Sequence, residues 1–154
     1  MSSGSAFGAA FGPSSGGRPS SSPGSDRGRE PCPCGSGRVY AGCCGAIHDG
    51  VRPARTAEAL MRSRYSAFAL RLPEYLATSW HPMTRPLEIY LAPGHQWLGL
   101  EILDTEAGGP DDTIGTVTFR ARTRSGGGRE STMTEVSRFE RYDGAWVYVD
   151  GDVT

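Results

Sequence analysis

The sequence predicts an α+β fold in which helices precede an antiparallel sheet and pack on one of its faces. Apolar residues recur at helical spacing between residues 56 and 80, and the spacing changes to two after about residue 96. A block rich in cysteine and glycine stands before both segments. Helices followed by consecutive strands with short turns are typical of a sheet that is covered on one face by helices.

The first 30 residues form a segment that we predict to be a disordered tail. Serine, glycine and proline account for 18 of residues 1–25, and the only large apolar side chains there are Met1, Phe7 and Phe11. Such a composition buries too little apolar surface to offset the cost of ordering the chain, which is roughly 1–2 kcal/mol per residue.

A cysteine-rich block, residues 31–50, predicts a small metal site. Its four cysteines have the spacing C-x-C-x8-C-C and are Cys32, Cys34, Cys43 and Cys44. Two close pairs joined by a short loop suit a tetrahedral ion, and four thiolates without an open position favour one structural Zn²⁺. The binding free energy of such an ion, about 10–16 kcal/mol at pH 7, would fold a block that has no core of its own.

The spacing leaves other chemistry open for these cysteines. Disulfides are disfavoured because a bridge between the adjacent Cys43 and Cys44 would be strained, and a redox or iron–sulfur role is a further alternative. The closed zinc site either has a structural role alone or also forms part of a surface that docks a partner. His48 follows Cys44 by four residues and could replace a cysteine ligand, although four thiolates already complete a tetrahedral shell.

Two helices are predicted between residues 56 and 81. Thr56 can cap the first helix, and Glu58 lies in its first turn, where a negative charge suits the helix dipole. Pro73 suits the first position of a second helix, which His81–Pro82 ends. The apolar stripe of the first helix consists of Met61, Tyr65, Phe68 and Leu72.

A four-stranded meander is predicted after residue 96, with turns at 108–112 and 125–128. Residues 97–103 are apolar on both faces and predict a buried strand, whereas residues 116–122 alternate as a half-buried strand does. Residues 131–141 place Glu135 on the same face as Met133 and Phe139. Asp143–Gly144 is typical of a two-residue hairpin turn before a last strand that begins at Ala145.

Composition and charge exclude several classes of function. The chain has 154 residues, no lysine and a formal net charge of −1, which argues against bulk electrostatic binding to nucleic acid. No stretch approaches the ~18–20 consecutive apolar residues of a membrane span, and the first residues lack the pattern of a secretory signal. We therefore expect a cytoplasmic protein, in which the four cysteines are metal ligands rather than disulfides.

The run CPCGSGRVYAGCC resembles the SEC-C motif, a zinc knuckle also found at the C-terminus of the SecA translocation ATPase. Together with TAEALMRSRYSAFAL, YLATSWHP, WLGLEIL, SRFER and WVYVDG, it makes residues 32–151 similar to the bacterial YchJ-like family. The resemblance implies a zinc knuckle at 31–50 and carries the ligand roles onto its four cysteines. It also implies an NTF2-like domain at 54–154, a cone of helices packed into a strongly curved sheet, a kind of sheet that often pairs into a homodimer.

An NTF2-like cone often encloses a pocket between sheet and helices, so the resemblance implies a candidate ligand site. We expect Glu135 to point inward, either in an ion pair with Arg62 or Arg64 that fixes helix against sheet, or as a catalytic base or ligand anchor; an outward, solvated Glu135 also stays open. The three tryptophans fit a hydrophobic core better than a ligand platform. The candidate pocket residues are Arg62, Tyr65, Trp80, Trp97, Glu135 and Trp146.

Functions of two different classes are compatible with these residues. The first is a non-enzymatic zinc-binding adaptor, whose knuckle docks a protein or ribosome-associated partner and whose cone is a scaffold or holds a small ligand. The second is a small enzyme of isomerase or dehydratase type with Glu135 or His81 as general base. His81 ends a helix, where it either caps backbone carbonyls or faces the cone. One complete metal site, without a nucleophile–base constellation, favours the adaptor.

Overall fold

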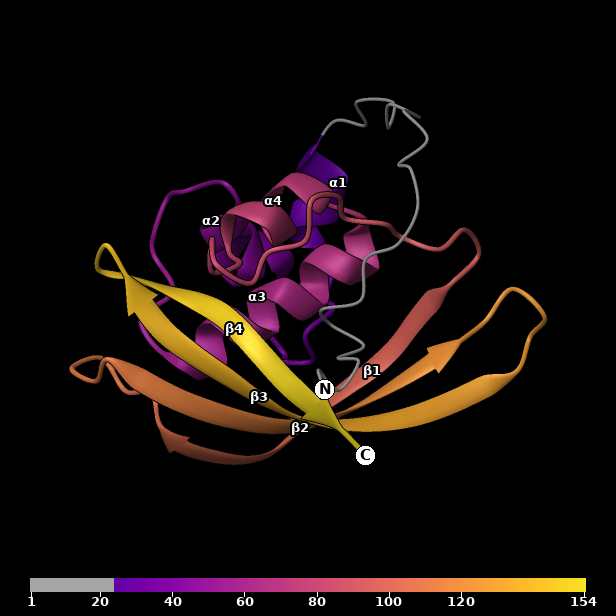
Figure 1. Cartoon of the computed structure of the whole chain (residues 1–154). Coiled ribbons are helices and arrows are strands. Elements are labelled where there is room, and N and C mark those ends of the chain that lie inside the picture. Colours follow the sequence, from indigo (N-terminus) through magenta and orange to yellow (C-terminus); the bar gives the residue numbers. More distant parts are fainter. Residues whose placement is uncertain (1–23) are drawn as a thin grey trace.

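The computed structural model describes residues 24–154, in which helices pack into the hollow of a curved antiparallel sheet (Figure 1). The strand order is β1-β2-β3-β4, so each strand pairs with its neighbour in sequence. The α+β prediction is therefore confirmed. In chain order, the elements are α1 (Gly24–Arg29), the 3₁₀ turn η1 (Tyr40–Gly42), α2 (Cys44–His48), α3 (Ala57–Leu70), α4 (Pro73–Thr78), β1 (Gln96–Ala107), β2 (Ile114–Arg124), β3 (Glu130–Tyr142) and β4 (Ala145–Val153).

Helix α1 corrects one boundary of the sequence prediction. It occupies Gly24–Arg29, within the segment that we predicted to be a disordered tail. The rest of that segment, residues 1–23, lies outside the described residues.

The long helix α3 begins and ends where local chemistry requires. Thr56 is its N-cap, with a hydroxyl that accepts a hydrogen bond from the Ala59 amide at 3.0 Å, as predicted. Arg71 ends the helix in the left-handed conformation, with a φ of 61°. Helix α4 then starts at Pro73, whose missing N–H costs nothing in a first turn.

Strands β2 and β3 alternate as predicted and supply most of the inner face of the sheet. Val117, Phe119 and Ala121 of β2 are fully buried. The β3–β4 hairpin turns at Asp143 and Gly144, with φ values of 51° and 83°, the pair of positive φ angles that a type I′ turn requires. The sequence pattern therefore predicted strands β2 and β3, and the turn between β3 and β4, correctly.

The prediction for β1 was wrong in its extent and its burial. This strand runs over Gln96–Ala107 and lies at the edge of the sheet, paired only with β2. Its register shifts between Trp97 and Gly99 and again between Ile102 and Asp104, so the alternation of faces is interrupted twice. Leu103, predicted to be buried, has an exposed fraction of 39%.

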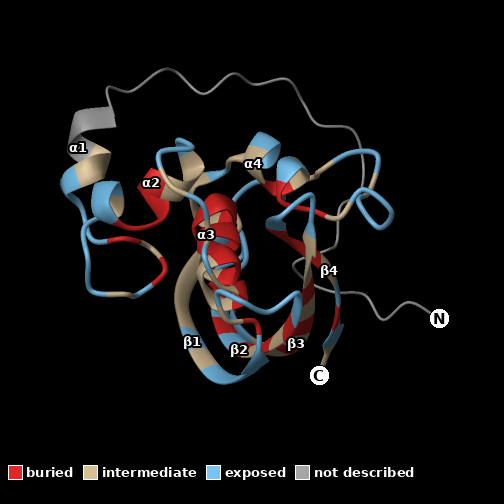
Figure 2. Cartoon of the chain, turned by 90° about the vertical axis from the view of Figure 1, so that its left-hand side faces the viewer, coloured by how far each residue is buried: buried red, intermediate tan, exposed pale blue. Residues whose placement is uncertain are grey.

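Helix α3 lies at the centre of the hydrophobic core, inside the curve of the sheet (Figure 2). Its apolar side chains pack against Phe119, Phe139 and Tyr148 of the inner sheet face. The four cysteines form a second, separate buried cluster, to which Tyr40 and Leu100 pack. None of the described helices is long and apolar enough to cross a membrane.

Candidate metal centre

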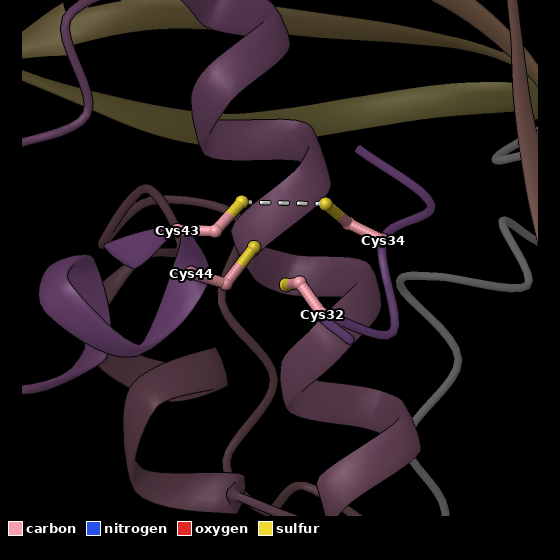
Figure 3. Close-up of side chains that lie close together, drawn as sticks. All are labelled: Cys32, Cys34, Cys43 and Cys44. Carbon is pink, nitrogen blue, oxygen red and sulfur yellow. Dashed lines mark hydrogen bonds between the residues drawn. The ribbon is translucent and has the colours of Figure 1, made fainter. Parts of the chain in front are cut away.

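The four cysteine side chains converge on one point (Figure 3). Their sulfur atoms all lie within 4.8 Å of one another, and the Sγ atoms of Cys34 and Cys43 are 3.7 Å apart. Tetrahedral coordination with Zn–S bonds of ~2.3 Å would separate the sulfurs by about 3.8 Å, whereas a disulfide requires ~2.05 Å. All four cysteines are free and buried, so the cluster has the spacing of a metal centre rather than of disulfides.

The backbone of the knuckle (residues 31–50) explains how so short a segment brings four sulfurs together. The first pair of cysteines precedes a tight turn in which Gly35 and Gly37 have φ values of 79° and 87°, which L side chains rarely adopt. A β-bridge between Pro31 and Val39 closes this turn. The second pair stands at the start of α2, which begins at Cys44. A tight turn and a helix start thus face each other across the cluster.

The thiols of the cluster have pKa values shifted in opposite directions. Hydrogen bonds from Cys34 and Cys44, with a further one from Ser66, lower the pKa of Cys32 to about 3. Hydrogen bonds to Cys32 and Cys34, together with burial, raise the pKa of Cys44. Ionisation of Cys32 is therefore favoured and that of Cys44 is opposed, and a bound cation would supply the charge that compensates further thiolates.

Polar groups around the sulfurs form a second layer. The hydroxyl of Ser36 lies 3.1 Å from Sγ of Cys43, and that of Ser66 lies 3.6 Å from Sγ of Cys32. Such contacts orient metal ligands and tune their basicity. Sequence reasoning missed Ser66, because it stands on α3, 34 residues from its cysteine; the GSG turn around Ser36 was visible but carried no signal of this contact.

His48 is an anchor of the knuckle and lies outside the four-sulfur group. Its Nε2 donates to the Ser63 carbonyl at 2.8 Å, and its Nδ1 accepts from the Tyr40 hydroxyl at 2.6 Å. Both ring nitrogens are therefore used, and the alternative in which His48 replaces a cysteine ligand finds no support. Burial lowers the pKa of His48, which keeps the ring neutral for these two bonds.

Arg62 also joins the knuckle to α3. Its Nη1 donates to the Cys34 carbonyl at 2.8 Å, and its Nε bonds Glu58 at 2.9 Å. We considered Arg62 as a pocket residue and as a partner of Glu135. The structure instead directs its guanidinium toward the cysteine loop.

Glu135 points into the core, as one of the interpretations predicted. Its side chain is fully buried, and Oε2 accepts hydrogen bonds from Ser137 at 2.8 Å and Tyr148 at 2.9 Å. Arg64 is the nearby buried arginine, and the charge of Glu135 counteracts the burial that lowers the pKa of Arg64 to about 10. The Tyr148 hydrogen bond joins β4 to β3, and Arg64 of α3 lies 4.7 Å from the centroid of the same Tyr148 ring, which links the helix to this part of the sheet.

The aromatic candidates separate into three places. Tyr65 meets Trp97 edge-to-face with ring centroids 5.6 Å apart, beside β1. Trp80 meets Tyr148 edge-to-face at 5.4 Å, and the hydroxyl of the same Tyr148 donates to Glu135. Trp146 lies elsewhere, where its Nε1 donates to the Arg55 carbonyl at 3.1 Å. Trp80 and Glu135 therefore share Tyr148 as a neighbour, but the structure does not gather all six candidates in one pocket.

His81 lies near the β3–β4 hairpin, where its carboxylate partner is Glu140. Its Nε2 is 2.9 Å from Oε1 of Glu140, and its Nδ1 accepts from the Met83 amide. The ring also contacts Tyr142 at a centroid distance of 5.3 Å. His81 thus uses its side chain in a carboxylate pair, in place of the helix-end carbonyls that one of the two interpretations predicted.

Comparison with known proteins agrees with this architecture. A family model described as YchJ, middle NTF2-like domain, matches residues 56–151, and the SEC-C motif model matches residues 29–46. A UPF0225 protein of Streptomyces coelicolor is 56% identical over 122 residues, covering 79% of this chain and 94% of the relative. A UPF0225 protein of Chromobacterium violaceum is 50% identical over 127 residues, covering 80% and 93%.

Two solved structures share the fold. The solution structure of a SEC-C motif containing protein from Rhodopseudomonas palustris is 37% identical with a TM-score of 0.70, covering 79% of this chain and 96% of that one. The crystal structure of a SEC-C motif containing protein from Psychrobacter arcticus is 28% identical with a TM-score of 0.67, covering 80% and 82%. With its SEC-C cysteine cluster joined to an NTF2-like domain, the chain belongs to the YchJ family, UPF0225.

Proposed function

We propose that this protein is a zinc-dependent adaptor, in which Zn²⁺ bound by Cys32, Cys34, Cys43 and Cys44 holds the knuckle in shape and the knuckle docks a protein partner. The observation that carries the proposal is the group of four buried sulfurs within 4.8 Å. Thiolates select a soft ion such as zinc over magnesium or calcium. Four protein ligands fill the tetrahedral shell, so the ion supplies a crosslink and no position for substrate.

Three contacts on α3 support the docking role, because they mount the knuckle rigidly on the larger domain. Ser63 accepts from His48, Arg62 donates to the backbone of the cysteine loop, and Ser66 contacts a cysteine sulfur. A surface that is fixed before binding loses less conformational entropy when a partner binds. The NTF2-like domain serves in this proposal as the scaffold.

The enzymatic alternative receives less support from the same coordinates. Glu135 is fully buried and bonded to Ser137 and Tyr148, and His81 is paired with Glu140. A general base must reach the proton that it removes, within about 2.6–3.2 Å or through one water. The two candidates are thus used in separate structural contacts and not in a shared acid–base pair.

Metal analysis of purified protein tests the zinc centre. We expect one zinc per chain by elemental analysis and native mass spectrometry, which also reports subunit number and any retained small molecule. The Cys34→Ser variant should lose the metal, whereas His95→Gln, which removes a potential ligand outside the cluster, should retain it. Protein that binds no zinc, or a His95→Gln variant that loses it as Cys34→Ser does, would refute the site.

Partner capture tests the adaptor role. Zinc-loaded protein, chelator-treated protein and chelated protein with zinc restored serve as three baits in extract from the protein's own host, with ribosomes pelleted as a separate fraction. We expect a protein that is retained by the first and third baits and lost from the second. Identical sets of proteins on all three baits would contradict a zinc-dependent docking function.

A further inference from the structure

A groove of about 620 Å³ lies beside the cysteine cluster, between the knuckle and the first turns of α3. This volume is within the ~300–1,000 Å³ typical of ligand sites. Its walls come from the turn around Ser36, the start of α2, the linker at residues 52–55 and the α3 residues up to Arg62. The groove is therefore shared by the motif and the larger domain, and neither forms it alone.

The groove is positively charged, although the whole chain has a net charge of −1. Glu58 is the single carboxylate among its lining residues, which leaves a net charge of +3. A zinc ion on four thiolates would contribute −2, and the groove would still be positive. The cationic lining residues are Arg38, Arg52, Arg55 and Arg62.

The guanidinium groups of two of these arginines are fixed by hydrogen bonds, and those of the other two have N–H groups available for a ligand. Arg52 donates to the Gly42 carbonyl at 2.8 Å, and Arg62 is fixed by Glu58 and the cysteine loop. Among the described residues, the guanidinium of Arg38 makes only a long contact of 3.9 Å, to Sγ of Cys43. Arg55 is exposed, and its guanidinium has no hydrogen bond or ion pair within residues 24–154. The core tryptophan that bonds the Arg55 carbonyl nevertheless fixes its backbone.

The remaining lining residues indicate which kind of anion fits. Ile47, Pro53 and Ala59 give the groove an apolar part between the arginines. No aromatic ring is among the lining residues, whereas proteins that bind single-stranded nucleic acid stack its bases on aromatic side chains. Guanidinium groups match the planar geometry of carboxylates. Carboxylates interspersed with apolar side chains complement this lining, as a short acidic peptide would supply.

We propose that this groove binds an acidic peptide segment of the partner protein, with carboxylates on Arg38 and Arg55 and an apolar side chain over Ile47 and Pro53. The proposal rests on the adaptor function above and names the chemistry that the knuckle recognises. Zinc contributes by holding one wall of the groove, and α3 holds the other.

Selection from a phage library of random octapeptides on the zinc-loaded full chain tests this proposal. We expect enrichment of peptides with aspartate or glutamate next to an apolar residue. A labelled copy of the best peptide should bind about tenfold more weakly to Arg55→Gln, since a charge-assisted hydrogen bond is lost. Arg129→Gln makes the same change in net charge in the β2–β3 turn, away from the groove, and should bind as the wild type does.

Separate outcomes overturn the two proposals. Enriched peptides without acidic residues, or equal affinity for Arg55→Gln and wild type, would overturn the acidic-peptide site. Displacement of the peptide by oligo-dT or inorganic phosphate at lower concentration than by unlabelled peptide would also overturn it, in favour of a phosphate ligand. Equal binding by zinc-loaded and chelated protein would instead refute the adaptor function, because the knuckle would then be dispensable.

Discussion

Gly45 shows how closely the knuckle is packed around its cysteines. A Cβ at this position would lie 2.7 Å from the Tyr40 carbonyl oxygen and 2.9 Å from its ring. Backbone cannot move away cheaply, so we expect Gly45→Ala to cost about 1–3 kcal/mol of stability and to weaken metal binding. Thermal unfolding and a competitive zinc titration measure both effects.

A glycine in open space provides the matched control. Gly126 has no atom within 4 Å of an added Cβ and lies in the β2–β3 turn. Gly126→Ala should leave both the melting temperature and the zinc affinity at their wild-type values. If Gly45→Ala and Gly126→Ala lowered stability and zinc affinity equally, close packing against Tyr40 would not be the cause of the loss.

His48 predicts a pH dependence of folding. Burial holds the pKa of His48 below its ordinary value of about 6.5, so the unfolded chain takes up a proton at a higher pH than the folded chain does. The stability from the neutral ring is complete above about pH 6.5 and is lost as the pH falls below that value. We expect this slope to be shallower in His48→Gln, as measured by denaturant unfolding between pH 5 and 7.5.

The comparison of slopes isolates the histidine. Protonation of the cysteines also weakens metal binding in acid, but it affects wild type and variant alike. The difference between the two curves therefore reports the imidazole alone. Parallel curves over the whole range would show that His48 does not contribute to the acid sensitivity.

Helix α3 is the element that joins the parts of the molecule. On one side it contacts the knuckle, and on another Arg64 donates to the Leu76 carbonyl at 2.9 Å and to Ser79 Oγ at 2.7 Å, which ties it to the region of α4. The same guanidinium lies 4.7 Å from the ring centroids of both Trp80 and Tyr148. Because it is fully buried, this one cation organises two helices and the sheet.

We expect Arg64→Met to destabilise the protein by about 3–5 kcal/mol, because it leaves the buried charge of Glu135 without its nearby cation. Chemical denaturation measures the loss. Glu135→Gln, combined with Arg64→Met, should recover part of it, since the two charges act on each other. Strictly additive losses in this double-mutant cycle would mean that the two groups are independent.

Elements set by local chemistry were predictable from the sequence. Thr56 as a cap and Pro73 as a first-turn residue act within a few residues of themselves, and they begin helices in the structure as predicted. Asp143–Gly144 likewise selects its own turn. The cluster of four cysteines was also predictable, because their spacing in the sequence alone matches a tetrahedral site.

Features that depend on distant partners were not predictable in this way. The two register shifts of β1 belong to its pairing with β2, so the largely apolar run at residues 97–103 gave no sign of them. The contact between Ser66 and Cys32 joins residues 34 positions apart. The role of His48 depends on Tyr40 and on a backbone carbonyl of α3, neither of which a motif identifies.

At the scale of the whole molecule, the two buried clusters predict two levels of stability. The cysteine cluster has no large apolar core, whereas the other cluster contains aromatic residues from α3 and the sheet. We expect chelation to increase amide hydrogen exchange in residues 31–50 and to leave the amides of β2 and β3 protected. Adding zinc back should restore protection in residues 31–50. If chelation instead increased exchange equally in the knuckle and in β2 and β3, the two clusters would not differ in stability.

The two outer strands of the sheet differ in how they discourage unwanted association. Tyr148 of β4 is bridged by Trp80, while β1 has two register shifts against β2 and carries Asp104 and Glu106 toward its end. A foreign strand that approached β1 would find an irregular ladder and like-charged carboxylates instead of a straight template. At high concentration we therefore expect the protein not to form filaments through the edge of β1.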